Sequence, residues 1–299
     1  MRLFRKPQPI TTVVLDADGT TLNPDHEMTE SVAAAINEAR DAGLRVIMAT
    51  GRARGGPWVD RILTPMNLTS PGVFLQGLTA FDESDVRIHD QLLDASAVAA
   101  VEAVCVGDDR ITLCAYCQEQ LITPTYNSRT EMYCGYDDAQ CVLPDNWEEC
   151  NVEADPWCVG DAVSAARETG APGVSKLLLL GSGDTEMIDE LQAKLKRKLR
   201  FQPARVVRAL DWTLEILPSD ASKGNAVRVL LDELGVDPME VMAVGDGEND
   251  MEMLKMVGHP VAMGNAVPKL KKIAKHVVGT NGEDGVAQAL REIAMAKAD

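Results

Sequence analysis

Two aspartates, one residue apart, follow a predicted strand near the start of the chain. The segment LDADGTTLN, residues 15–23, places Asp16 and Asp18 directly after an apolar run. Because side chains alternate along an extended strand, both carboxylates leave its end on the same side, and Gly19 lets the chain turn there. Two such carboxylates can bind a hard divalent cation, or divide nucleophilic attack and proton transfer between them. A plain turn with solvated acids fits the same pattern, so the motif alone leaves both interpretations open.

Two further segments offer groups that bind a phosphate oxygen. MATGR, residues 48–52, places the Thr50 hydroxyl and the Gly51 amide after the next predicted strand. SKGNAV, residues 222–227, places Lys223 at the start of a predicted helix, where the helix N-terminus and the ammonium together favour an anion. Taken singly, the first is an ordinary turn and the second an ordinary surface lysine.

A third segment offers ligands for a metal ion. VGDGENDMEML, residues 244–254, ends another predicted strand in Asp246, Asn249 and Asp250. Two carboxylates and an amide around a glycine turn suit magnesium and its water shell. The segment lacks the alternating aspartates and the terminal glutamate of an EF-hand calcium loop.

Short apolar runs alternate with amphipathic stretches in both terminal parts of the chain, and this alternation positions the four segments. It predicts a parallel, doubly wound α/β sheet, whose active site lies beyond the carboxyl ends of the strands. The predicted strands are residues 11–19, 44–51, 72–77, 241–247 and 259–265, and the predicted helices are residues 29–42, 223–234 and 250–257.

The middle of the chain, residues 86–217, breaks this alternation. RVVRAL and WTLEIL, residues 205–210 and 212–217, predict an antiparallel hairpin near its end. We interpret the region as an α+β module inserted into a core of residues 1–85 and 218–299. It contains an acidic tract from Thr130 to Ala166 and a basic stretch from Lys194 to Arg208. The acidic tract is a candidate surface for a basic partner, and the basic stretch is a solvated face or a means of steering anionic substrates.

Composition excludes several classes of protein. A formal net charge of -17 argues against a protein that binds nucleic acid or an anionic membrane surface, since both need a basic face. No apolar run approaches the ~20 residues needed to cross a bilayer, and the first nine residues lack the apolar core of a secretory signal. We therefore expect a cytoplasmic location, with an organellar one open if a targeting peptide is removed.

All seven cysteines lie between Cys105 and Cys158. An odd number in a chain of this size favours reduced thiols over a disulfide framework. Cys114 and Cys117 form a CxxC that supplies half of a zinc site, but no second CxxC follows. Buried or surface thiols are the interpretation we prefer, with structural zinc as the alternative.

The four segments, in the order Asp16, Thr50, Lys223, Asp246, resemble the motifs of the haloacid dehalogenase superfamily, specifically the Cof-type phosphatases. The resemblance covers nearly the whole core, and the inserted module occupies the position of that subgroup's large cap. VAMGNA, residues 261–266, and NGEDGV, residues 281–286, resemble the closing motifs. The resemblance implies a Rossmann-like core with an inserted α+β cap that contacts the substrate.

The resemblance also implies a role for each motif residue. Asp16 is expected to be the nucleophile that forms an aspartyl-phosphate, and Asp18 the acid and base that serves the leaving oxygen and the attacking water. Magnesium is expected on the Asp16 carboxylate, the Asp18 main-chain carbonyl and the Asp246 carboxylate. The residues expected to bind the phosphoryl oxygens are Thr50, Gly51, Arg52, Lys223 and Asn249. Those expected to support the metal are Asn249 and Asp250.

The expected activity is hydrolysis of a small phosphomonoester, such as a sugar phosphate, a nucleotide-like phosphate or a vitamin precursor. The alternatives are a phosphosugar mutase and a catalytically idle binding or assembly subunit, although an idle member usually lacks one of the two aspartates. The chain departs from the family at Gln76, which stands where asparagine is common, and at Asp220, which stands where glycine is frequent.

The aromatic residues of the module have two interpretations. They form its core, or one or two of them stack on a ring of the substrate. The residues concerned are Tyr116, Tyr126, Tyr133, Tyr136, Trp147 and Trp157.

Overall fold

The computed structural model describes residues 8–105, 107–117, 120–123, 127–137, 141–142, 173–208 and 210–296. The chain divides into two compact units, each described by itself below. The first comprises Met1–Arg54, Val59–Asp90 and Ser222–Asp299, and the second comprises Gly55–Trp58 and Gln91–Ala221.

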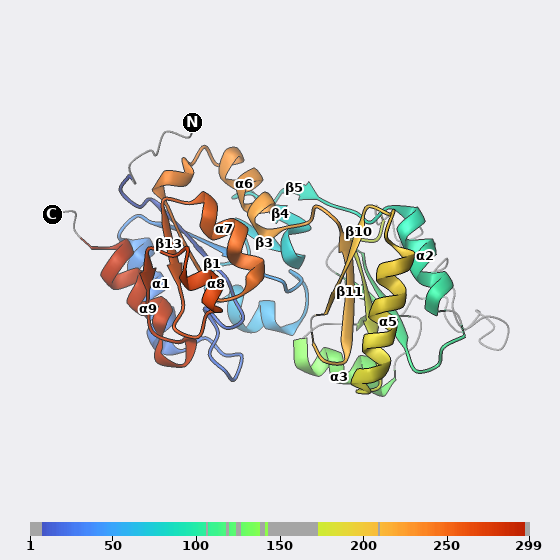
Figure 1. The fold of residues 1–299 in the computed structure, drawn as a ribbon. Helices are drawn as coiled ribbons and strands as arrows, with labels where there is room; N and C mark the ends of the chain where they lie inside the picture. The colour runs from blue at the N-terminus through green and yellow to red at the C-terminus, as the bar shows by residue number, and fades with distance from the viewer. Residues whose placement is uncertain are drawn as a thin grey trace. The chain divides into compact units, whose positions relative to one another are not determined.

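The first unit is built on one sheet with the strand order β14-β13-β12-β1-β2-β3-β4-β5 (Figure 1). Neighbours from β14 to β3 are parallel, whereas β4 and β5 are added antiparallel. Its strands are β1 (Thr12–Leu15), β2 (Arg45–Ala49), β3 (Gly72–Phe74), β4 (Thr79–Phe81), β5 (Arg87–Asp90), β12 (Val241–Gly245), β13 (His259–Ala262) and β14 (His276–Val277). β1 is entirely buried between β12 and β2, so its carboxyl end lies at the centre of the sheet.

Helices accompany this sheet in two groups, α1 packed against α9 and α6 packed against α7 (Figure 1). They are α1 (Glu30–Asp41), α6 (Lys223–Glu233), α7 (Met251–Met256), α8 (Pro268–Lys271) and α9 (Gly285–Ala289). Thr29 caps α1 by accepting a hydrogen bond from the Val32 amide, and Ser222 caps α6 by accepting one from the Asn225 amide. The predicted α/β class with a parallel sheet is confirmed. One element differs, since β5 pairs with β4 in this sheet although residue 86 began the module predicted from sequence.

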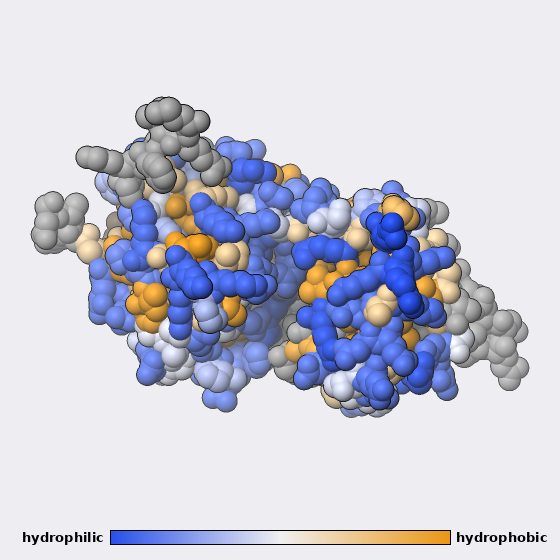
Figure 2. Space-filling model, viewed as in Figure 1, coloured by the Kyte–Doolittle hydropathy of each residue, from blue (hydrophilic) through white to orange (hydrophobic). Residues whose placement is uncertain are grey.

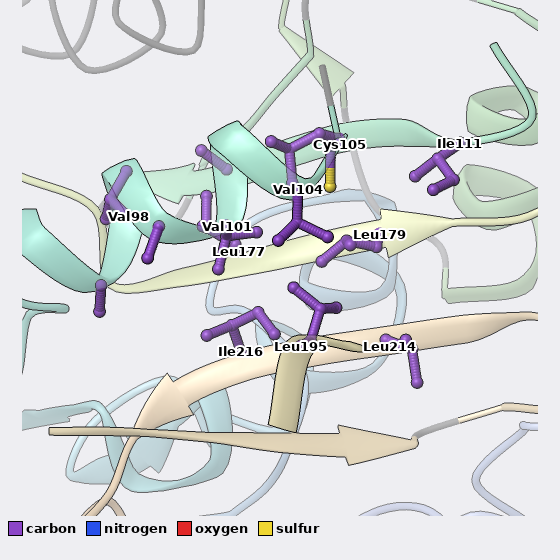
Figure 3. Close-up of a cluster of buried hydrophobic side chains, with 14 of the residues drawn as sticks. Val98, Val101, Val104, Cys105, Ile111, Leu177, Leu179, Leu195, Leu214 and Ile216 are labelled. Carbon is purple, nitrogen blue, oxygen red and sulfur yellow. The ribbon is translucent and has the colours of Figure 1, made fainter. Parts of the chain in front are cut away.

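The described strands of the second unit form a sheet with the order β10-β11-β9-β6-β7-β8. Its elements are α2 (Ala95–Cys105), β6 (Thr112–Cys117), β7 (Gln120–Ile122), α3 (Ser128–Asp137), β8 (Cys141–Val142), β9 (Lys176–Leu180), α5 (Thr185–Lys198), β10 (Ala204–Arg208) and β11 (Thr213–Pro218). The predicted hairpin is confirmed, with Val206 opposite Ile216 in antiparallel register. Side chains of α2 and α5 pack on one face of β6, β9 and β11 and make the core that Figure 3 shows.

The two cysteines of the CxxC lie on β6, three residues apart. Because side chains alternate along a strand, Cys114 and Cys117 point to opposite faces, and only Cys117 belongs to the core under α2 and α5. Burial raises the pKa of each thiol to about 12. These positions favour buried thiols over a shared zinc ion.

Several features predicted for the module fall outside the described residues. These are Tyr126, Trp147, Trp157 and most of the acidic tract, and the side chain of Tyr136 is also outside them. Tyr116 and Tyr133 are buried, with their hydroxyl oxygens 3.3 Å apart. Substrate stacking by these aromatic residues stays a prediction.

The visible surface of each unit is mostly hydrophilic (Figure 2), in keeping with the net charge of -17. Within the described part of the chain, no helix combines the length and the apolar character needed to span a membrane.

Candidate active site

The predicted site residues follow adjacent parallel strands of the first unit. Asp16 comes directly after β1 and donates its amide hydrogen to the Val244 carbonyl of β12 at 3.1 Å. Thr50 follows β2, and Asp246 follows β12. Because these strands are parallel neighbours, their carboxyl ends meet at one edge of the sheet. The topology therefore brings together segments more than 200 residues apart in sequence.

Lys223 lies at the centre of a buried group of charges. Its Nζ donates hydrogen bonds to Asp16 Oδ1 and, at 2.8 Å, to Asp250 Oδ1. Lys223, Asp16 and Asp250 are 1%, 5% and 0% exposed. One lysine at the start of α6 thus holds a carboxylate from the segment after β1 and another from the segment after β12.

Asp250 shapes the loop after β12. Its Oδ2 accepts hydrogen bonds from the amides of Asp246 and Gly247, each at 3.0 Å. A Cβ on Gly245 would lie 2.6 Å from the Asp250 carboxylate, so glycine is needed there for the close approach. One carboxylate oxygen of Asp250 therefore fixes the loop, and the other accepts the hydrogen bond from Lys223.

Asp246 is held by residues from the other strand ends. Its Oδ1 accepts a hydrogen bond from Thr20 Oγ1 at 3.2 Å, and Asn265 Nδ2 lies 3.4 Å from its Oδ2. Asn265 also donates to the Gly19 carbonyl at 2.8 Å. Gly19 has φ +73°, and a Cβ there would lie 2.4 Å from Asp246 Oδ2. Glycine at this position therefore lets the loop after β1 pass close to the Asp246 carboxylate.

The charges of this group are unbalanced. Burial, followed by the negative charge of Asp250, raises the pKa of Asp16 well above its ordinary value, and the same two causes raise the pKa of Asp246. Burial alone would lower the pKa of Lys223, but the charges of Asp16 and Asp250 raise it above its ordinary value. Three carboxylates share one ammonium, so the cluster lacks positive charge.

The carboxylates suit a hard divalent cation. One oxygen from each of Asp16, Asp246 and Asp250 lies within 4.8 Å of the others. Oxygen donors of this kind, in a site short of positive charge, match the ligand preference of Mg²⁺. The residues present therefore fit a divalent metal.

Asp18 has different partners from Asp16. Its carboxylate forms a two-point ion pair with Arg52, from Nε to Oδ2 at 2.9 Å and from Nη2 to Oδ1 at 2.7 Å. His26 Nδ1 lies 3.1 Å from the same Oδ1. Burial raises the pKa of Asp18, but the hydrogen bonds and charges of Arg52 and His26 outweigh that effect, and the net direction is downward. The Arg52 guanidinium, expected from sequence on phosphate, is thus bonded to a carboxylate.

The remaining predicted residues lie in the segments after β2 and β12. Thr50 is fully buried, and its Oγ1 accepts a hydrogen bond from the Arg52 amide at 3.1 Å. A Cβ on Gly51 would lie 2.5 Å from Gln76 Nε2. Asn249 Nδ2 donates to Gln76 Oε1 at 3.0 Å. Gln76, noted only as a departure from the family, thus links the Gly51 and Asn249 segments.

Among the described residues, sequence reasoning gave no role to four whose side chains bond to side chains of the predicted ones. They are Thr20, His26, Gln76 and Asn265. Asn265 lies within the VAMGNA segment, and its amide in a conspicuous motif was a usable signal. No sequence signal pointed to the contacts of His26 and Gln76, because these contacts depend on backbone turns in which the two residues have φ of 59° and 62°.

Comparison with known proteins places the chain in a family. The model of the haloacid dehalogenase-like hydrolases matches residues 13–290. The chain is 32% identical over 303 residues to Endoribonuclease YBEY, chloroplastic, of Arabidopsis thaliana, a match that covers 97% of this chain but 47% of that protein. It is 26% identical to 5-amino-6-(5-phospho-D-ribitylamino)uracil phosphatase YwtE of Bacillus subtilis, over 94% of this chain and 97% of that one.

Among solved structures, TM0651 from Thermotoga maritima is similar with a TM-score of 0.77 and 25% identity, over 96% of this chain and 98% of that one. The family model covers more than nine tenths of the chain, the core and the inserted region together, and the structural likeness extends over nearly the whole of both chains. The chain therefore belongs to the haloacid dehalogenase-like hydrolases, in their Cof-type branch.

Proposed function

We propose that this chain is a magnesium-dependent phosphatase that hydrolyses a small phosphorylated metabolite through an aspartyl-phosphate on Asp16. Its enzyme class is that of the phosphoric monoester hydrolases. The support is its family, together with a match over nearly the whole length of a relative named as a phosphatase. The nucleophile, the metal and the substrate class are the proposal. One observation carries it: a buried Asp16, bonded to Lys223, lies beside two further carboxylates at the centre of the sheet edge.

In the proposed first step, an Asp16 carboxylate oxygen attacks phosphorus and the bond to the leaving oxygen breaks. Asp18 supplies the proton that the leaving oxygen takes up. In the second step water attacks phosphorus, Asp18 accepts a proton, and Asp16 is released with inorganic phosphate. The two aspartates have distinct partners, Lys223 for Asp16 and Arg52 with His26 for Asp18, and the pair with Arg52 holds Asp18 as the carboxylate that the second step needs as its base. For the first step Asp18 has to carry a proton when the substrate binds.

Positive charge is needed because a carboxylate and a phosphate dianion repel one another. In the proposal, Lys223 binds a phosphoryl oxygen together with the Thr50 hydroxyl and the Gly51 amide. Asn249 and Arg52 complete this set, with Arg52 acting through Asp18, since its guanidinium is bonded to that carboxylate.

Mg²⁺ is proposed to be held by the Asp16 carboxylate, the Asp18 main-chain carbonyl and the Asp246 carboxylate. Asn249 and Asp250 would support these ligands, and the hydrogen bonds of Asp250 to the Asp246 and Gly247 amides favour such a role. When bound, the cation would supply the charge that offsets the repulsion between nucleophile and phosphate.

The second unit is proposed to be the cap that recognises the rest of the substrate. One relative is named as a phosphatase of 5-amino-6-(5-phospho-D-ribitylamino)uracil, a compound in which a ring is joined to a phosphorylated polyol. We therefore propose substrates of three kinds: sugar phosphates, nucleotide-like phosphates and phosphorylated vitamin precursors.

The test is phosphate release from a panel of these compounds and p-nitrophenyl phosphate, with Mg²⁺ and with EDTA. Wild type is compared with Asp16→Asn and with Asp41→Asn, which makes the same change on the exposed end of α1. We expect Mg²⁺-dependent turnover in wild type and Asp41→Asn and its loss in Asp16→Asn. Turnover that persists in EDTA would contradict the metal, and turnover by Asp16→Asn would contradict the nucleophile.

A further inference from the structure

His26 contacts the pair formed by Asp18 and Arg52. Its Nδ1 lies 3.1 Å from Asp18 Oδ1 and 3.2 Å from Arg52 Nη2. With a proton on Nδ1 the ring donates to the carboxylate, and without one it accepts from the guanidinium. With the proton on Nδ1 the imidazole restrains the Asp18 carboxylate directly, and without it the ring holds the guanidinium that binds this carboxylate.

The three partners differ in exposure. The Arg52 side chain is 4% exposed, whereas Asp18 and His26 are 44% and 39% exposed. Arg52 is therefore fixed by its surroundings, and the open side of the Asp18 carboxylate is free to serve a reacting group. His26 is the partner that borders solvent, so its contact is the one a substitution can remove with least disturbance of the interior.

A tight turn built on Asn23 holds His26 in place. Asn23 Oδ1 accepts hydrogen bonds from the amides of Asp25 and Glu27, each at 2.9 Å. The Asn23 carbonyl accepts from the His26 amide, and the Asn23 amide donates to the Glu27 carbonyl, both at 2.9 Å. His26 itself has φ 59°, in the left-handed region that non-glycine residues seldom adopt.

The left-handed residue and the contact with Asp18 coincide. Residues kept in strained backbone conformations gather at functional sites, where the surrounding structure enforces them. Here four hydrogen bonds of one turn enforce the conformation, and its result is an imidazole against the carboxylate proposed as acid and base.

We propose that His26 is a positioning residue for Asp18, aligning its carboxyl for proton transfer to the leaving oxygen. This inference rests on the proposed phosphatase function. Loss of the His26 side chain would remove one of the two described partners of the Asp18 carboxyl, so that the carboxyl, still paired with Arg52, is less well aligned with the leaving oxygen. The loss of activity is then expected mainly for substrates whose leaving group needs a proton.

The experiment compares two leaving groups. Glycerol 2-phosphate releases an alkoxide that must be protonated, whereas p-nitrophenyl phosphate releases a stabilised phenolate that needs little help. The parameter is kcat/KM, which reports the steps up to formation of the aspartyl-phosphate and not its hydrolysis. For His26→Gly, which accommodates φ 59° without a side chain, we expect kcat/KM to fall roughly tenfold more for glycerol 2-phosphate than for the aryl ester.

Two further variants make the test specific. In His26→Asn the side-chain amide takes the position of Nδ1 in a residue that tolerates the left-handed region, so it should restore most of the difference. In an Asp18→Asn background, His26→Gly should change the ratio between the two substrates little, because the group that it positions is gone.

The outcomes separate the two proposals. Equal losses on both substrates, or an additive effect in the Asp18→Asn background, would overturn the role of His26 and leave the phosphatase intact. A wild type that hydrolyses neither ester would contradict the proposed function itself. Should His26→Gly fail to fold, His26→Asp keeps the left-handed preference and repels Asp18, so it should show a larger selective loss.

Discussion

Each unit of the protein buries a lysine against a carboxylate, but the two groups differ in balance. In the second unit, Lys176 Nζ lies 2.6 Å from Glu215 Oε1, both side chains are at most 7% exposed, and the Tyr116 ring centroid is 4.6 Å from the ammonium. In the first unit, Lys223 faces Asp16 and Asp250, with Asp246 close by. One pair is neutral as it stands, whereas the other group has more negative than positive charge.

This difference separates a pair that stabilises a fold from a group suited to chemistry. A balanced buried pair carries no net charge and needs no further ion, although apolar residues of similar size often serve as well. Surplus carboxylates around one ammonium gain from an added cation, and such sites are where shifted pKa values gather. The comparison predicts different responses when the two lysines are changed in the same way.

The largest effect is expected for Lys223→Met. It removes the ammonium from Asp16 and Asp250 and the proposed phosphoryl contact, so kcat/KM on p-nitrophenyl phosphate should fall roughly 10²–10⁴-fold. It should also cost about 3–5 kcal/mol of unfolding free energy, because two buried carboxylates lose their partner. Steady-state kinetics and urea unfolding measure the two effects. A loss of activity below tenfold would contradict the assignment.

Lys176→Met is the matched control in the second unit. Alone it leaves Glu215 buried without its partner and should cost about 3 kcal/mol of unfolding free energy. The double variant Lys176→Met/Glu215→Leu should recover most of that loss, since it removes both charges. Urea unfolding of the single and double variants measures this. If the double variant were as unstable as the single one, the pair would not be the self-contained unit described above.

A smaller effect concerns Asp18 and pH. Its folded pKa is lowered, so the stability that it contributes is present above its unfolded pKa and is lost as pH falls through the folded value. In metal-free buffer, wild type should therefore melt at a higher temperature than Asp18→Asn at neutral pH, and the difference should shrink as the solution is acidified below pH ~4. A difference in melting temperature that grows on acidification would have the wrong sign.

The smallest expected effect is on thiol chemistry. Cys105, Cys114 and Cys117 are buried, and burial is the main cause that raises the pKa of each to about 12. A thiol reacts as its thiolate, so these three should resist iodoacetamide in the native protein at pH 8 and react after unfolding. Peptide mass spectrometry resolves each cysteine. Rapid native labelling of Cys114 or Cys117 would contradict the buried positions in β6.

Much of the first unit was predictable because its signals are local. The apolar runs at residues 12–15 and 241–245 and the capped helix that begins at Glu30 follow from periodicity and capping residues. The hairpin of β10 and β11 was equally local. β5 was assigned to the wrong unit because its pairing with β4 depends on tertiary packing, and its polar sequence RIHD has no apolar alternation to mark it.

The candidate site was predictable where each residue belongs to a motif at a strand end. Asp16, Lys223, Asp246 and Asp250 meet because parallel strands deliver them to one edge. The partners of Asp18 were not predictable, since the contact of His26 depends on a left-handed turn. Arg52 was expected on phosphate because it belongs to the MATGR motif, whose resemblance to the family implied a phosphate-binding role. Its bond to Asp18 depends on how the segment after β2 folds back.

The central claim, that Asp16 is the nucleophile, is tested most directly by finding the phosphoryl group on it. Wild type is mixed with excess substrate and Mg²⁺ and quenched in acid within milliseconds, because acyl phosphates survive at low pH. The peptide that contains Asp16 is then examined by mass spectrometry, with Asp16→Asn as control. We predict a phosphoryl adduct on Asp16 in wild type, absent from Asp16→Asn and released by hydroxylamine. An adduct on another residue of a turning-over enzyme would contradict the account.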